Sequence, residues 1–145
     1  MIIFSIDVGR TMGFVMMRDS DLLFYEEIKF ESLQKLYEVA DKWITLTPPD
    51  LILIPYPTRI YNVIVMQSKL SAIIEMVAEK HNVPVILMND KHCKKTILNN
   101  GKAQKKDIYD YYYQKYSENK LQCEIKSEHV LDAIMFAETY LADIA

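Results

Sequence analysis

Three side chains that can bind a metal ion or transfer a proton lie close together in the segment KSEHVLDAIMFAETYL. They are Glu128, His129 and Asp132. Glu128 lies four residues and His129 three residues before Asp132, so all three are on one side of a predicted helix. The other side carries an apolar stripe that predicts a core contact, made of Val130, Ile134, Ala137 and Leu141.

An ordinary helix start is the competing interpretation of the same residues. Acidic side chains suit the first turn because they interact favourably with the helix dipole, and Ser127 is well placed as the N-cap. This explains Glu128 well and Asp132 only in part, because Asp132 lies beyond the first turn. The helix alone favours this second interpretation, so the rest of the chain has to decide between them.

Composition limits the classes of protein that need to be considered. The chain has 145 residues, of which half are hydrophobic and about a quarter are charged, which predicts one globular domain over residues 1–145. The net charge of −3 gives no overall electrostatic attraction to nucleic acid, so a local basic patch would have to provide it.

Cellular context is predicted from the cysteines and from the first residues. Cys93 and Cys123 lack metal-site spacing, which favours free thiols in a reducing compartment. The apolar start MIIFSI reaches Asp7 too soon for a signal peptide or a membrane span. We therefore expect a cytoplasmic protein, or one inside a host cell, with no membrane partner.

Hydrophobic patterning predicts a three-stranded antiparallel meander followed by alternating helices and strands. The meander has Gly9 and Gly13 at its corners. The strands are expected at 1–7, 12–17, 22–30, 50–54 and 84–88, and the helices at 32–45, 62–81, 91–100, 104–116 and in the last segment. The order β-β-β-α-β-α-β-α-α predicts an α/β protein with a five-stranded mixed sheet and helices on both faces, which is the order of an RNase H-like fold. In such a fold the first strand ends beside the start of the last helix, so Asp7 is expected to meet Asp132 in one metal site.

Two segments are similar to motifs of a known nuclease family. IDVGRTMGFVMM resembles an opening strand-turn-strand of the form IDPG…TG, in which the aspartate, here Asp7, is a metal ligand. HVLDAI resembles a later DAADAL or HAADAL motif, which places His129 and Asp132 at ligand positions three residues apart.

A lysine-rich segment and an asparagine extend the similarity. KHCKKTILNNGKAQKKDI resembles a family segment whose two lysines face DNA phosphates, and these fall on Lys94 and Lys105. Asn62 matches an asparagine after the fourth strand. In this order, the motifs resemble those of the RuvC family of Holliday junction resolvases.

The resemblance implies a metal-dependent, structure-specific endonuclease that acts on branched DNA in recombination and repair. Asp7, His129 and Asp132 would be catalytic and would bind Mg²⁺, with Glu128 as a further ligand, and the imidazole makes Mn²⁺ possible. A homodimer is expected, because four-way junctions have two-fold symmetry.

One position departs from the family pattern. The fourth strand of the family ends in a catalytic glutamate, whose position falls on Pro55, and proline has no ligand atom. A family aromatic residue falls on Thr58, with Tyr56 and Tyr61 nearby, and Glu26 or Glu27 is a candidate for the missing carboxylate. The alternative function is therefore a DNA-binding or scaffold protein that keeps the fold and basic patch without cleavage.

Positive charge is concentrated in one part of the sequence. Six lysines within sixteen residues form either a DNA-binding patch or a solvated face, and we favour DNA contact: Lys91, Lys94, Lys95, Lys102, Lys105 and Lys106. Arg10 and Arg59 are expected to extend this patch, with Tyr56 and Asn62 as further contacts. The tyrosines of YDYYYQKY could stack on bases, but packing against the sheet or a partner subunit is favoured for Ile108, Tyr111, Tyr112 and Tyr116.

Overall fold

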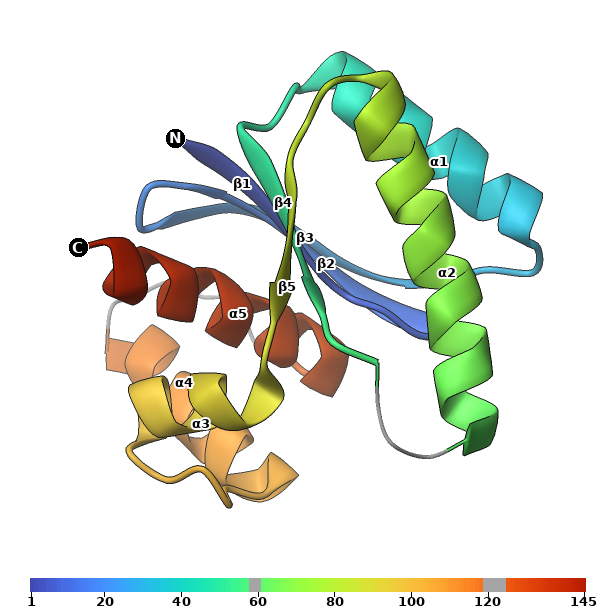
Figure 1. The fold of residues 1–145 in the computed structure, drawn as a ribbon. Helices are drawn as coiled ribbons and strands as arrows, with labels where there is room; N and C mark the ends of the chain where they lie inside the picture. Colours follow the sequence, from blue (N-terminus) through green and yellow to red (C-terminus); the bar gives the residue numbers. More distant parts are fainter. Residues whose placement is uncertain (58–60, 119–124) are drawn as a thin grey trace.

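The computed structural model describes residues 1–57, 61–118 and 125–145, and the side chains of residues 61–64 and 117–118 are outside that description. Each predicted element is present, and the three helices expected after the last strand are α3, α4 and α5, one more than the order β-β-β-α-β-α-β-α-α counts (Figure 1). The strands are β1 (Ile2–Asp7), β2 (Thr11–Arg18), β3 (Asp21–Lys29), β4 (Leu51–Pro55) and β5 (Val85–Met88). The helices are α1 (Leu33–Leu46), α2 (Tyr61–Lys80), α3 (Asp90–Leu98), α4 (Lys105–Glu118) and α5 (Glu128–Ile144).

The five strands form one mixed sheet in the order β3-β2-β1-β4-β5. Strands β1, β2 and β3 are antiparallel neighbours, which confirms the predicted meander, whereas β4 pairs in parallel with both β1 and β5. All of β4 is buried, as its continuous apolar run predicted.

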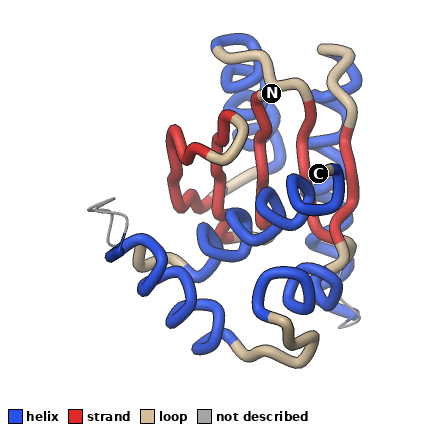
Figure 2. The backbone as a smooth tube through the Cα atoms, turned by 90° about the vertical axis from the view of Figure 1, so that its left-hand side faces the viewer, coloured by secondary structure: helices blue, strands red, loops and turns tan. Residues whose placement is uncertain are grey.

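Helices cover both faces of the sheet and give the protein two hydrophobic cores. Helices α1 and α2 lie on one face, and α3, α4 and α5 lie on the other (Figures 1 and 2). Alternate residues of β1 point to opposite faces, so that Phe4 belongs to the core under α1 and α2 while Ile3 belongs to the core under α5. Among the helices of the described residues, none combines the length and apolarity that crossing a bilayer would require.

Helix α5 is more completely buried than the predicted single apolar stripe implies. It lies between the sheet and helices α3 and α4, and every residue from Val130 to Ala137 is buried. The buried set includes Asp132, which lines a cleft together with His129, so the side of α5 opposite the apolar stripe is also largely covered. A helix in the middle of three layers has contacts on all sides and has no solvent face along its central turns.

Two contacts hold α5 against the sheet. The prediction that Gly13 lies at a corner was wrong: it sits inside β2, paired with Asp7, and a Cβ atom there would overlap the carbonyl group of His129. Further along, the buried Ser5 hydroxyl donates a 2.5 Å hydrogen bond to the carbonyl oxygen of Ala133. The start of α5 is therefore fixed beside the end of β1.

Candidate active site

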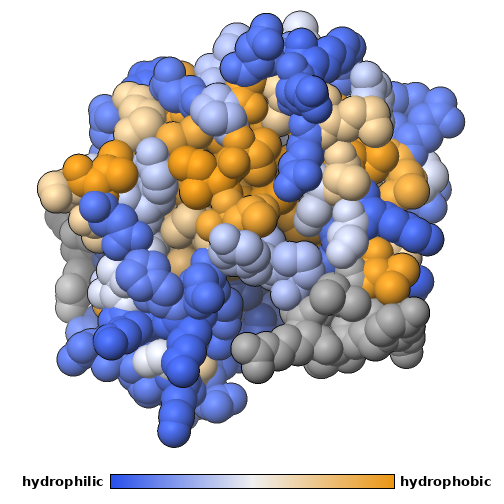
Figure 3. Space-filling model, viewed as in Figure 1, coloured by the Kyte–Doolittle hydropathy of each residue, from blue (hydrophilic) through white to orange (hydrophobic). Residues whose placement is uncertain are grey.

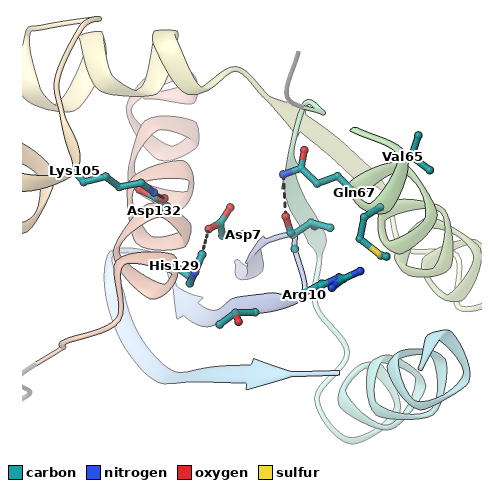
Figure 4. Close-up of a pocket in the computed structure, with 11 residues that line it drawn as sticks. Asp7, Arg10, Val65, Gln67, Lys105, His129 and Asp132 are labelled. Carbon is teal, nitrogen blue, oxygen red and sulfur yellow. Dashed lines mark hydrogen bonds and ion pairs between the residues drawn. The ribbon is translucent and has the colours of Figure 1, made fainter. Parts of the chain in front are cut away.

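A cleft of about 610 Å³ opens at the end of β1. Its floor is the segment from Asp7 to Thr11, one wall is formed by Val65, Met66 and Gln67 of α2, and the other by residues of α4 and α5 (Figure 4). The Gln67 side chain donates a 3.1 Å hydrogen bond to the carbonyl oxygen of Val8, which ties α2 to the turn after Asp7. The cleft is thus built from segments far apart in the sequence.

Asp7 and His129 form the first polar pair of the cleft. The distance from His129 Nδ1 to Asp7 Oδ2 is 2.9 Å, and both side chains are partly buried. The hydrogen bond to Asp7 raises the pKa of His129, and the negative charges of Asp7 and Glu128 act in the same direction, while burial opposes them. Ser127 caps α5, because its hydroxyl accepts a hydrogen bond from the Val130 N–H, so the helix begins at the point that brings His129 to Asp7.

Asp132 and Lys105 form the second pair, one helical turn further along α5. Lys105 Nζ lies 2.9 Å from Asp132 Oδ2, with about 10% of the Asp132 side chain exposed and 60% of the Lys105 side chain. Burial and the charge of Asp7 raise the pKa of Asp132 to about 6, although Lys105 partly offsets this. Burial lowers the pKa of Lys105, but the carboxylates of Asp132, Glu128 and Asp7 outweigh it, so the pKa is raised overall.

The predicted metal ligands share the cleft without forming a metal-binding cluster. Asp7, His129 and Asp132 all line it, as predicted, but no group of three metal-ligating side chains lies within coordinating distance among the described residues. Two carboxylates and an imidazole suit a divalent cation chemically. In the present arrangement, however, these ligand atoms already have other hydrogen-bond partners. Lys105 is hydrogen-bonded to Oδ2 of Asp132, and Nδ1 of His129 is hydrogen-bonded to Asp7. The donor set does not fit a metal ion unless Lys105 moves away.

The remaining candidate ligands lie outside the cleft. The Glu128 side chain is 56% exposed, with its Oε1 3.9 Å from His129 Nε2, and it lines a neighbouring groove. Glu27 accepts a 2.8 Å hydrogen bond from the Ser127 hydroxyl in that same groove, and Glu26 is exposed. Pro55 is buried at the end of β4 and is not part of the cleft lining.

The predicted DNA-binding residues are divided between the cleft and the outer surface. Arg10 and Lys105 line the cleft. Lys94 forms a 2.8 Å ion pair with Asp90 on its own helix, and the side chains over α3 and α4 are mostly hydrophilic in Figure 3. Lys91, Lys95, Lys102, Lys106 and Tyr56 are exposed, whereas Arg59 and the side chain of Asn62 lie outside the described residues.

The aromatic stretch of α4 divides into buried and exposed tyrosines. Ile108, Tyr112 and Tyr116 are buried in the core beneath α5, which confirms the packing interpretation for them, and the Tyr112 hydroxyl donates to Glu138 at 2.9 Å. Tyr109 and Tyr113 instead lie on the outside of the helix, with their rings stacked on one another.

A second groove next to the cleft brings Lys29 and Lys126, which the sequence did not single out, together with residues of the predicted basic and aromatic segments. It has a volume of about 670 Å³, and we call it the lysine groove. Its lining includes Lys29 of β3, Lys105, Lys106 and Tyr109 of α4, and Lys126 before α5. These residues come from three parts of the chain, and only the fold shows that they meet.

Comparison with known proteins agrees with this description at the level of the fold. The chain matches no protein-family profile and no curated protein sequence. Among solved structures, T. thermophilus RuvC in complex with a Holliday junction substrate aligns with a TM-score of 0.81 and 16% identity, over 96% of this chain and 92% of that one. The fowlpox virus resolvase in complex with Holliday junction DNA aligns with a TM-score of 0.70 and 19% identity, over 99% of both chains. The protein therefore has the RuvC-like form of the RNase H fold, as its element order and motifs predicted.

Proposed function

We propose that the protein is a nuclease that cuts branched DNA, with its active site in the cleft at the end of β1. The observation that carries this proposal is the convergence of Asp7, His129 and Asp132 on one cleft from opposite ends of the sequence. Structures with the same fold include two resolvases bound to Holliday junction DNA, which supports a junction as the substrate.

The side chains of the cleft suit phosphodiester hydrolysis in identifiable roles. When His129 donates its Nδ1–H to Asp7, Nε2 is the nitrogen that can accept a proton. In the proposed step, Nε2 removes a proton from a water molecule while the water oxygen bonds to phosphorus. The bond to the leaving sugar oxygen breaks, and that oxygen takes a proton from solvent. Arg10 and Lys105 supply positive charge to the phosphate in the same cleft.

The test is the incubation of the purified protein with labelled four-way junctions in Mg²⁺, in Mn²⁺ and in EDTA. We expect cleavage by the wild type, and its loss in Asp7→Asn and Asp132→Asn variants that still fold. Linear duplexes of the same sequence are the control for structure specificity. A wild type that leaves junctions intact under all three conditions would overturn the nuclease proposal.

A junction-binding protein without cleavage is the second candidate. Two observations favour it: the buried Pro55 where the resemblance places a glutamate, and the Lys105–Asp132 ion pair in the cleft. In this case the wild type shifts junctions in a gel without cutting them. Asp7→Asn then keeps or improves the affinity, because it removes a negative charge near the phosphates.

We also propose that the protein acts as a homodimer, because two copies related by a two-fold axis match the symmetry of a four-way junction. Light scattering from the protein with and without junction DNA tests this. A mass of one chain in both states would contradict it.

A further inference from the structure

The lysine groove combines positive charge with an aromatic surface, although the whole chain is acidic. Four lysines line it against two glutamates, and Lys105 is already paired with Asp132 of the cleft. Glu27 is hydrogen-bonded to Ser127, at the side of the groove formed by α5. Lys29 and Lys106 are exposed, and neither forms an ion pair with an acidic side chain among the described residues.

Tyr109 provides the aromatic surface. It lines the groove with 41% of its surface exposed, and its ring stacks on that of Tyr113 with the ring centroids 5.9 Å apart and the planes 18° from parallel. The two tyrosines lie one helical turn apart on α4, so the stack stands on a regular element. An exposed aromatic ring beside several lysines is typical of surfaces on which an unpaired base stacks.

The groove is continuous with the cleft. Thr11, Lys105 and His129 line both, so a chain that leaves the cleft past His129 enters the groove directly. Thr11 also pairs with Lys29 across the sheet, which places that lysine at the junction of the two hollows.

We propose that the lysine groove binds a single DNA strand that continues from the cleft, with its phosphates on Lys29, Lys106 and Lys126 and one unpaired base stacked on Tyr109. This inference rests on the proposed function. It adds the path of the substrate strand beyond the cleft and the requirement that the strand is unpaired there. A duplex keeps its base faces stacked inside and would offer the groove only phosphates, so Tyr109 selects an unpaired strand.

The first arm of the test measures binding in EDTA, so that no metal-dependent cleavage interferes. Junction DNA carries 2-aminopurine, whose fluorescence is quenched on stacking, at successive positions next to the branch point. We expect the wild type and Tyr109→Phe, which keeps the ring, to quench the probe at one of these positions, and Tyr109→Leu to lose that quenching. Equal quenching by Tyr109→Leu and wild type would overturn the base-stacking assignment.

The second arm measures the salt dependence of binding to a single-stranded oligonucleotide. Lys29→Ala and Lys126→Ala should each make the slope of log K against log salt shallower by about 0.7, the value for one phosphate contact on a single strand. Lys42→Ala is the matched control, because Lys42 is an exposed lysine of α1 on the other face of the sheet. Slopes unchanged in both groove variants would overturn the proposed strand path.

The two proposals fail in different ways. A protein that never cuts junctions but loses quenching in Tyr109→Leu refutes the nuclease and supports the groove. A protein that cuts junctions in a manner dependent on Asp7, with wild-type behaviour of all groove variants, supports the nuclease and refutes the groove.

Discussion

Replacing Lys105 by methionine should increase the affinity of the cleft for divalent cations. A cation that uses Asp132 must displace the Lys105 ammonium, which lies 2.9 Å from Oδ2. Asp132 is largely buried, but Lys105 is more than half exposed, so solvent screening reduces the value of this ion pair. We assign it about 1–2 kcal/mol, which corresponds to a gain of about 5- to 30-fold in cation affinity when the lysine is removed.

The pH of the measurement matters for this prediction. Burial already raises the pKa of Asp132 to about 6, and Lys105 lowers it, so removing the lysine raises it further. Protons then compete with the cation near neutral pH and mask part of the gain. Titration calorimetry with MnCl₂ at pH 8 keeps the carboxylate ionised and shows the full effect.

Lys102→Met is the matched control, because it removes the same charge from an exposed loop residue outside the cleft. We expect it to bind Mn²⁺ like the wild type, and Asp132→Asn to bind it more weakly. The reasoning is refuted if Lys105→Met binds Mn²⁺ no more tightly than the Lys102→Met control at pH 8.

Three further predictions concern stability and reactivity. Gly13→Ala should lower the free energy of unfolding by at least about 2 kcal/mol, seen as a Tm drop of roughly 5–10 °C, because its methyl group overlaps the His129 carbonyl. Burial raises the pKa of Cys93 from 9.0 to about 11, so at pH 8 its thiolate fraction is roughly 100-fold lower than that of an ordinary thiol. In a Cys123→Ser background, DTNB should therefore label Cys93 only when the protein unfolds. Hydrogen bonds from His81 and Lys80 lower the pKa of Asp41, so the Asp41→Asn variant should be less stable than the wild type at pH 7. The melting temperatures of the two proteins should converge as the pH falls below 3.8 and the carboxylate of the wild type is protonated.

Each of these has an outcome that contradicts it. Gly9→Ala is the control for the first prediction, because a Cβ there meets only the Thr11 carbonyl oxygen at 3.3 Å. Equal melting temperatures of the two alanine variants would show that the close contact of Gly13 with His129 does not matter for stability. Rapid labelling of the folded protein by DTNB would contradict the burial of Cys93. A stability difference for Asp41→Asn that does not shrink as the pH is lowered from 5 into the strongly acidic range would show that its cause is not the ionised carboxylate.

The sequence predicted most of the fold because the elements are marked by local patterns. The continuous apolar run of β4, the apolar segment MGFVMM of β2 and the Ser127 cap of α5 each depend on residues close together in the chain. Asp7 and His129 could be brought together from the sequence because element order and motif position both pointed to the same edge of the sheet.

Contacts between distant segments could not be read in the same way. The sequence marks Lys105 as basic, but its pairing with Asp132 depends on the angle at which α4 meets α5. Lys29 belongs to no motif, and it shares a groove with Tyr109 only because β3 ends and α4 begins near the start of α5. A glycine that permits close approach looks in sequence like a glycine of a turn, which is why Gly13 was misplaced.

The two attachments of α5 have a consequence for how the proposed active site would accommodate a DNA substrate. At Gly13 the backbones of strand and helix meet with no side chain between them, and at Ser5 a buried hydrogen bond fixes the position of the helix along its axis. Backbone contact cannot relax by a change of rotamer, so α5 neither slides nor turns relative to β1. Asp7 and His129 therefore behave as one rigid unit with the sheet. In the proposed complex, adjustment to the shape of a branch point would therefore fall on the exposed side chains that line the cleft and the lysine groove, such as Arg10, Lys29 and Lys106.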